Sequence, residues 1–349
     1  MKLVLAVVVG DEADVVDAQL AFHLNAGVDF VIATDQGPGG GASEILEAYA
    51  REGHVRRIPA DPASEDDLRT HMLGLAATEH GADWVLTGDA DEFWWPRGES
   101  LKDVLAAIPP RYEVVQALVR VFPPRPGDEP FVERMTVRPA LREVRDEARE
   151  PLPYVLRPVY RADPRIVVEP GDGTGGGARV PLRAWYPIEL LRFPFRSLEQ
   201  AEREVSREPR RAPRSALEAE ALEAYGRGAL EEWYATYAAD QHLVHEGAES
   251  ALVPDERLRD ALRALRRPDS AATAPPPRYV LPGEGAEPLV LRVPDIVDDA
   301  SYAVECAAVG EVDLVRLDGQ IRELESRIAW LEARFWPRVR RTLSRVVRR

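Results

Sequence analysis

The chain is short of cysteine and of long apolar runs, and both shortages limit what it can be. Cys306 is the only cysteine among 349 residues, which excludes an intrachain disulfide and a zinc site built from cysteines. We therefore expect a reducing compartment, the cytoplasm. No apolar stretch approaches the roughly 20 residues needed to cross a bilayer, so we expect any membrane contact to be peripheral.

Positive charge is also scarce. The chain has 60 acidic against 45 basic residues, a net charge of −15. This balance disfavours general binding to nucleic acid, because phosphate contacts need a basic surface. Only Lys2 and Lys102 are lysines; we attribute the arginine bias to a GC-rich coding sequence and infer no function from it.

The first ninety residues alternate short apolar runs with segments of helical period. This pattern predicts an α/β fold in which a mainly parallel sheet is flanked by helices. The run at 3–9 is apolar at every position, as expected of a strand buried on both faces. A signal-peptide core is not expected here, because the run is only seven residues long, lacks a small-residue cleavage pattern and leads straight into acidic residues. The predicted strands are 3–9, 30–34, 55–59 and 84–87, and the predicted helices lie near 14–25, 42–52 and 64–79.

Beyond residue 109 the pattern breaks into shorter strand-like pieces, at 113–122, 154–160 and 165–169, which we expect to complete the sheet. Changes in composition then suggest where the chain divides. We expect a first domain over 1–197, a helical extension over 198–267, a proline-rich linker over 268–288, a small unit over 289–316 and an amphipathic tail over 317–349.

The tail combines a coiled-coil pattern with a basic end. Its apolar residues are spaced four, three, four and three apart, as at the a and d positions of a coiled coil. They are Leu317, Ile321, Leu324, Ile328 and Leu331. After Glu332 the tail carries seven arginines and no acidic residue. A helix of this kind suits peripheral binding to an anionic membrane surface, self-association, or simple exposure to solvent.

A cluster of acidic residues follows the predicted strand at 84–87. Asp89 and Asp91 are one residue apart, and Glu92 comes next, followed by Phe93-Trp94-Trp95. In open α/β sheets ligands bind beyond the carboxyl ends of the strands, where such carboxylates can hold a divalent cation bound to a diphosphate. Hard oxygen ligands suit Mg²⁺ or Mn²⁺. The alternative is a solvated acidic turn.

A series of motifs runs through the first hundred residues: Val9-Gly10-Asp11-Glu12-Ala13-Asp14, His23, Gly27-Val28-Asp29-Phe30, Thr34-Asp35, Glu44-Ile45-Leu46 and Ala82-Asp83-Trp84-Val85-Leu86-Thr87-Gly88-Asp89-Ala90-Asp91-Glu92-Phe93. In order and spacing they resemble the members of glycosyltransferase family 2 that have a GT-A fold, and a weaker echo continues through residues 165–177 and Pro194-Phe195-Arg196-Ser197, to about residue 200. The resemblance implies transfer of a sugar from a nucleotide-diphosphate donor to a hydroxyl of a glycan or glycolipid acceptor, with inversion.

The resemblance also implies roles for individual residues. Asp89 and Asp91 would meet the metal ion, Mn²⁺ or Mg²⁺, and the diphosphate, and Asp35 would hold the nucleotide base. Asp11 and Glu12 belong to the motif that lines the nucleotide pocket.

The chain departs from the family pattern at three places. Residues 37–41 read Gly-Pro-Gly-Gly-Gly where relatives have a polar turn. Gly171-Asp172-Gly173 stands where relatives tend to have Gly-Asn-His, and Arg192 stands where they often have a histidine. Loss of both histidines removes expected metal or catalytic groups. Two hypotheses follow: Asp172 supplies a substitute metal ligand, or Arg192 neutralises phosphate without a metal.

The catalytic base is harder to assign. Inverting transfer needs a carboxylate or histidine to take the proton of the acceptor hydroxyl. Glu92 is the nearest candidate, although a structural role fits it equally well. His242 and His245 are three residues apart and can share a helical face, but isolated histidines are more often ordinary surface or core residues.

Two other functions remain open. The patterns Gly37-x-Gly39-x-x-Ala42 and Gly171-x-Gly173-x-x-Gly176 raise an NAD-dependent enzyme, although the first follows the second strand and the second precedes no helix. The eroded motifs also fit a non-catalytic relative that binds or scaffolds through its tail.

Overall fold

The computed structural model describes residues 1–36, 40–59, 65–139, 156–168, 179–183, 185–207, 215–239, 252–268, 275–284, 289–292 and 296–346. The chain divides into two units, Met1–Pro294 and Asp295–Arg349, which are described separately. The predicted metal ligand Asp172, the pair His242 and His245, and most of the glycine run after the second strand lie outside the described residues.

The first unit is built on a nine-stranded sheet with the order β3-β2-β1-β4-β8-β6-β10-β5, and β9 pairs with β6. Pairing is parallel throughout β3-β2-β1-β4, whereas β8 runs antiparallel to both of its neighbours. The strands are β1 (Leu3–Val9), β2 (Phe30–Asp35), β3 (Val55–Pro59), β4 (Trp84–Asp89), β5 (Glu92–Pro96), β6 (Val114–Val121), β8 (Leu156–Arg161), β9 (Pro181–Leu182) and β10 (Ile188–Arg192).

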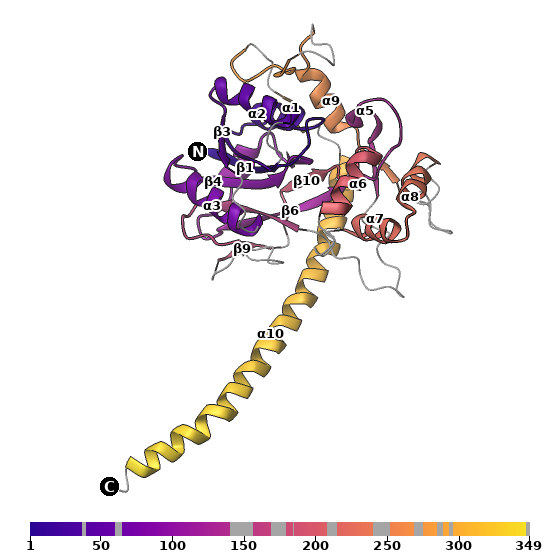
Figure 1. The fold of residues 1–349 in the computed structure, drawn as a ribbon. Helices are drawn as coiled ribbons and strands as arrows, with labels where there is room; N and C mark the ends of the chain where they lie inside the picture. Colours follow the sequence, from indigo (N-terminus) through magenta and orange to yellow (C-terminus); the bar gives the residue numbers. More distant parts are fainter. Residues whose placement is uncertain are drawn as a thin grey trace. The chain divides into compact units, whose positions relative to one another are not determined.

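Helices cover both faces of this sheet, which confirms the predicted α/β class (Figure 1). Strand β1 shows why its sequence is apolar throughout: residues 3, 5, 7 and 9 face the core beneath α1 and α2, and residues 4, 6 and 8 face the core beneath α3. The flanking helices are α1 (Val16–Asn25), α2 (Gly41–Arg51), α3 (Glu65–Thr78), α4 (Leu101–Ala106), α5 (Phe131–Arg134) and α9 (Arg257–Leu265).

The first four strands and three helices lie where the hydrophobic period predicts them, with bounds that differ by one or two residues. The predicted strand at 165–169 is different. Its described part, 165–168, begins in the turn at residues 164–165 and contains one isolated bridge residue, Val167, but no strand. Asp163 explains this locally, because its carboxylate accepts the backbone N–H of Arg165 at 2.8 Å and also pairs with the Arg165 side chain. That contact closes a turn in place of a ladder.

A helical extension follows the sheet and contributes one strand to the fold. Helices α6, α7 and α8 pack around Phe195 in a small core of their own. Strand β11 pairs antiparallel with β7 in a separate two-stranded sheet. The elements are β7 (Val137–Pro139), α6 (Leu198–Arg207), α7 (Ala216–Gly226), α8 (Leu230–Thr236), a short 3-10 helix (Tyr237–Ala239) and β11 (Leu252–Pro254).

Residues 275–284 of the expected linker are part of the first unit and contact its helices. The backbone N–H of Val280 donates to the carbonyl of Leu265 at 2.8 Å, and the side chain of Asn25 donates to the carbonyl of Val280 at 2.9 Å. Leu281 is buried in the main core. Proline-rich composition therefore coincides here with an extended segment that packs through its few apolar residues.

The second unit is a single long helix, α10 (Ile296–Val346). It begins well before Leu317, where the coiled-coil pattern starts, because the preceding residues include alanines at 300, 303, 307 and 308 that favour helix. Within the described part of the chain, no helix is both long enough and apolar enough to cross a membrane.

The buried imidazole of His23, in α1, forms a hydrogen bond that joins this helix to strand β5. Its Nδ1 lies 2.8 Å from the carbonyl of Gln19, and its Nε2 accepts the backbone N–H of Trp94 at 3.0 Å. The side chain is fully buried, and burial lowers the pKa of His23 to about 4. The folded protein therefore needs a neutral imidazole at this position.

We expect His23→Phe to destabilise the fold by about 1–3 kcal/mol at neutral pH, since it leaves the N–H of Trp94 buried without an acceptor. Because the pKa of His23 is lower in the folded state, its contribution is present above the unfolded value of about 6.5 and is lost as the pH falls toward 4. Urea unfolding of both proteins at several pH values tests this. The wild type should lose up to ~1.4 kcal/mol per pH unit more than the variant in this window, and parallel curves would contradict the assignment.

Candidate active site

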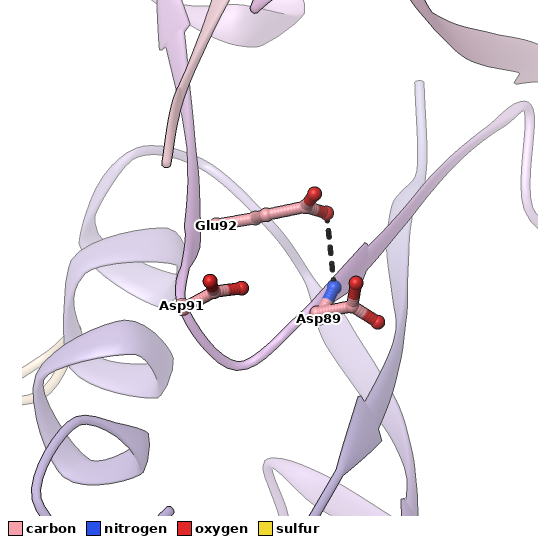
Figure 2. A group of neighbouring side chains, drawn as sticks. All are labelled: Asp89, Asp91 and Glu92. Carbon is pink, nitrogen blue, oxygen red and sulfur yellow. Dashed lines mark hydrogen bonds between the residues drawn. The ribbon is translucent and has the colours of Figure 1, made fainter. Parts of the chain in front are cut away.

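Three carboxylates meet at the turn between β4 and β5. Asp89 ends β4, Asp91 lies in the turn and Glu92 begins β5, and one ligand oxygen of each lies within 4.8 Å of the others. Figure 2 shows Glu92 reaching back across the turn, where its Oε2 accepts the backbone N–H of Asp89 at 3.0 Å. Asp91 and Glu92 are buried, with 5% and 1% of their surface exposed, whereas Asp89 is partly exposed.

The position of this turn in the sheet determines what surrounds it. Only two residues separate β4 from β5, yet β8, β6 and β10 lie between these strands in the order of the sheet. The register of β8 on β4, continued by two residues, places Arg157 opposite Gly88. The register of β10 on β5 pairs Arg192 with Glu92. The two neighbouring strands therefore each bring one arginine to the turn.

These arginines contact the carboxylates directly. Nη2 of Arg157 lies 2.8 Å from Oε1 of Glu92 and 3.8 Å from Oδ2 of Asp89. Nε of Arg192 lies 3.6 Å from both Asp91 and Glu92. Every carboxylate of the cluster thus has a guanidinium within ion-pair distance.

A third arginine approaches from helix α3. Nη2 of Arg69 lies 2.5 Å from Oδ1 of Asp89 and 2.6 Å from Oε1 of Glu65, one turn earlier on the same helix. Nη1 of Arg69 also donates to the carbonyl of Gly88 at 3.3 Å. Helix α3 therefore holds the end of β4 through one buried side chain.

The loop after β1 brings further carboxylates to the same edge of the sheet. Arg196 is buried and pairs with Asp14 at 2.6 Å and with Glu12 at 3.3 Å. Arg203 on α6 pairs with Asp11 at 2.8 Å. The loop is therefore fastened to the segment that follows β10.

Asp35 lies at the carboxyl end of β2 and is nearly buried. It accepts a short hydrogen bond from Oγ of Ser43 and pairs with Arg57 at 3.2 Å. In the ladders of β1, Asp35 is opposite Val9 and Asp89 is opposite Val8. Two strand spacings of roughly 5 Å put Asp35 about 10 Å from Asp89 along this edge.

The crowding of carboxylates shifts their pKa values. Burial raises the pKa of Asp91 well above its ordinary value, Glu12, Glu92 and Asp89 raise it further, and Arg192 opposes the rise only in part. Burial raises the pKa of Glu12 to about 7 against the opposing charge of Arg196. A group of perturbed carboxylates at the carboxyl edge of a sheet is typical of a functional site.

The helical extension adds one more carboxylate. Glu218 lies in the first turn of α7, where its backbone N–H donates to the capping hydroxyl of Ser215. Its Oε1 is 2.5 Å from Nη2 of Arg192, and 13% of its side chain is exposed. One guanidinium thus connects Glu218 to Asp91 and Glu92.

The donor atoms of the cluster fit a hard divalent cation, because they are carboxylate oxygens held within 4.8 Å of one another. Asp89, Asp91 and Glu92 are the residues that would hold it. Their oxygens already face Arg69, Arg157 and Arg192, so an entering cation must displace part of these contacts.

Comparisons with known proteins give matches among solved structures but none among family models or curated proteins. Among solved structures it is similar to S. aureus TarS 1-349 in complex with UDP-GlcNAc, with a TM-score of 0.35 and 14% identity over 70% of this chain and 77% of that chain. It is also similar to the mannosyltransferase PcManGT from Pyrobaculum calidifontis in complex with GDP-Man and Mn²⁺, with a TM-score of 0.29 and 14% identity over 72% of this chain and 77% of that chain.

A third similar structure is the mannose-1-phosphate geranyltransferase from Thermus thermophilus, with a TM-score of 0.25 and 17% identity over 73% of this chain and 74% of that chain. At such low identities and TM-scores these similarities carry no argument about the chemistry.

The structure gathers the sequence-predicted residues Asp11, Glu12, Asp35, Asp89, Asp91 and Glu92 at one edge of the sheet. Sequence reasoning missed Arg69, Arg157 and Glu218. Arg157 is distant in sequence and lies in a strand without a motif, so only the β8–β4 register reveals it. Glu218 follows Ser215 by three residues, a capping box that was readable from the sequence.

Removing Arg157 should strengthen binding of a divalent cation. We expect Arg157→Met to bind Mn²⁺ several-fold more tightly than wild type, because the cation no longer competes with a guanidinium for Glu92 and Asp89. Isothermal titration calorimetry measures the affinity. Arg56→Met, which removes an exposed pair with Glu79, should change nothing.

The loss of Arg157 also leaves Glu92 with less compensation, so folding has to be checked by thermal unfolding. Arg157→Lys keeps the positive charge and should bind Mn²⁺ with nearly wild-type affinity. Unchanged or weaker Mn²⁺ binding by a folded Arg157→Met protein would show that the arginine does not occupy the cation position.

Proposed function

We propose that this protein is a glycosyltransferase that moves a sugar from a nucleotide-diphosphate donor to a hydroxyl acceptor. The observation that supports this best is the Asp89, Asp91 and Glu92 cluster, with ligand oxygens within 4.8 Å, at the carboxyl end of β4. Asp35 lies two strands away on the same edge. A diphosphate at the cluster and a nucleoside at Asp35 match the dimensions of one bound nucleotide.

Each of these residues has its own role in the proposed donor site. Asp89 and Asp91 would hold a divalent cation, Mn²⁺ or Mg²⁺, and such a cation would supply positive charge to stabilise the diphosphate leaving group. Asp35 accepts hydrogen bonds from the nucleoside, and Asp11 and Glu12 line the pocket beside it. Asp172 is proposed as a further ligand of the cation.

We place the catalytic base at Glu218 in preference to Glu92. Both oxygens of Glu92 already have partners, the backbone of Asp89 and the guanidinium of Arg157, and the side chain is buried. Those contacts suit a group that holds the turn in shape. Glu218 is partly exposed on the extension and shares Arg192 with Asp91, which makes its side chain more accessible to an acceptor hydroxyl than that of Glu92.

The nature of the acceptor follows from the resemblance and from the tail. We propose a glycan or glycolipid acceptor, inversion at the anomeric carbon, and a place in polysaccharide synthesis as in glycosyltransferase family 2. A basic helix end suits work beside an anionic membrane surface on the cytoplasmic side.

Asp91→Asn should abolish donor turnover. Because Asp91 is the more buried of the two Asp-x-Asp carboxylates, water cannot easily take its place as a ligand of the cation. We expect hydrolysis or transfer to fall by at least ~10²-fold. The measurement is release of UDP, GDP or dTDP from a panel of their sugars, with and without Mn²⁺.

Asp128→Asn is the matched control, since Asp128 is an exposed loop carboxylate. It should leave turnover unchanged. If the wild type hydrolyses no nucleotide sugar under any condition, or if Asp91→Asn retains its activity, the proposed function is wrong.

Glu218→Gln should lower kcat by about 10²–10⁴-fold while KM changes little, because only proton removal is lost. Glu223→Gln is the control on the same helix, where the side chain is 69% exposed and pairs with Arg227. If Glu92→Gln lowers kcat in this way and Glu218→Gln does not, the base is Glu92.

A non-catalytic binding protein is the second candidate. The observation that favours it is the arginine beside each carboxylate of the cluster, since a site compensated in this way can bind a nucleotide without a cation. Nucleotide binding that is independent of Mn²⁺, with no turnover of any donor, would support this function instead.

A further inference from the structure

Helix α10 carries an exposed apolar stripe on the side of the heptad a and d positions (Figure 1 shows the helix). About half or more of each side chain in it is exposed: Leu314 66%, Ile321 53%, Leu324 55%, Ile328 55% and Leu331 45%. Leu317 completes the 3-4-3-4-3 spacing. The stripe covers about three heptads, or roughly 27 Å of helix at 1.5 Å per residue.

Most helices in proteins are stabilised mainly by packing of an apolar face against other parts of the structure, more than by intrinsic propensity. Gly319 lies within the helix and costs about 1 kcal/mol relative to alanine. The polar faces are served by local pairs such as Arg322 with Asp318 at 2.5 Å. The apolar stripe therefore indicates a partner that packs against it, and its heptad spacing suits a second helix.

We propose that the occupant is the same helix of a second copy, forming a parallel two-stranded coiled coil. The choice of residues indicates this number of strands. Isoleucine stands at two a positions, Ile321 and Ile328, and leucine stands at the d positions Leu317, Leu324 and Leu331. β-Branched residues at a with leucine at d favour parallel dimers over trimers and tetramers.

Charge selects the orientation. The e positions are Asp318 and Glu325 and, by sequence, Glu332. An antiparallel pair brings e positions together and so sets acidic residues against one another. A parallel pair instead sets each e position against a g position of the partner, and Arg327 at g then meets an acidic e position in the next heptad.

Pro337 limits how far the coiled coil extends toward the C-terminus. Pro337 lacks the backbone N–H that the helix would use, and proline in a helix interior weakens or kinks it. The pairing segment is therefore 314–335. Two copies joined in this way carry two catalytic units, whatever reaction those units perform.

Sedimentation equilibrium of the full chain tests the proposal. The average mass of the wild type should rise with protein concentration toward that of a dimer, twice the 38.8 kDa of one chain. Leu324→Glu should raise the dimer dissociation constant by at least ~100-fold, because it buries a carboxylate from each helix in the seam. Ser326→Glu adds the same charge at an exposed f position and should leave the dimer intact.

The orientation is tested by cross-linking in a Cys306→Ser background, which removes the only native cysteine. Leu314→Cys lies at one end of the stripe, so it should form an intermolecular disulfide under mild oxidation only if the helices are parallel. Ser326→Cys, on the outer face, should not.

A monomeric wild type, or a dimer that persists in Leu324→Glu, would overturn the proposal. A dimer without cross-linking of Leu314→Cys would overturn the parallel arrangement. A monomer that binds anionic vesicles through Leu324 would assign the stripe to a lipid surface instead. Donor turnover by the monomeric Leu324→Glu variant separates this question from that of the catalytic function.

Discussion

Burial of several carboxylates at one tight turn is the constraint on which the rest of the structure depends. Moving an ionised carboxylate out of water costs several kcal/mol unless nearby charges and hydrogen bonds compensate. Asp91 and Glu92 are almost fully buried, and their compensation comes from Arg157 and Arg192 on two strands that are distant in sequence. The strands must therefore keep their register for the turn to be tolerated at all.

The same arginines join the parts of the first unit. Arg192 ends β10 and reaches Glu218 on α7, and Arg196, four residues later, holds the loop after β1 through Asp14 and Glu12. Between them Phe193 stacks on Phe122 at 4.3 Å, which fixes the backbone on an apolar base. The ion pairs of Arg192 and Arg196 thus depend on a backbone that is held by aromatic packing, and a shift of β10 would disturb both the ion pairs and the packing.

Much of the first half of the fold could be predicted from sequence because its signals are local. An all-apolar run such as 3–9 predicts a strand buried on both faces. The acidic residues directly after β4 predict a ligand site, because ligands bind beyond the carboxyl ends of the strands in such sheets. The cluster itself was therefore predictable. Its partner Arg157 was not, because pairing of Arg157 with Glu92 depends on β8 entering between β4 and β6 against the order of the chain.

The extension shows the same limit on a smaller scale. Ser215 and Glu218 give a readable helix start, but nothing local indicates that the Glu218 carboxylate meets Arg192. The tail is the opposite case, since a coiled-coil seam is a repeat along a single helix and needs no tertiary register. Its spacing, residue choice and charges are all present in the sequence.

The balance of charge at the turn bears on how a donor would enter. The ion pairs described here set four arginines, at 69, 157, 192 and 196, against more carboxylates than they can neutralise, and the raised pKa values of Asp91 and Glu12 reflect burial together with this repulsion. A diphosphate alone would add negative charge to a site already short of positive charge. A divalent cation alone would have to break arginine pairs with nothing to take their place. A cation bound to a diphosphate brings both at once, with the phosphate oxygens free to accept the guanidinium groups that the cation displaces. The arrangement of carboxylates and arginines therefore favours entry of the two together over entry of either alone.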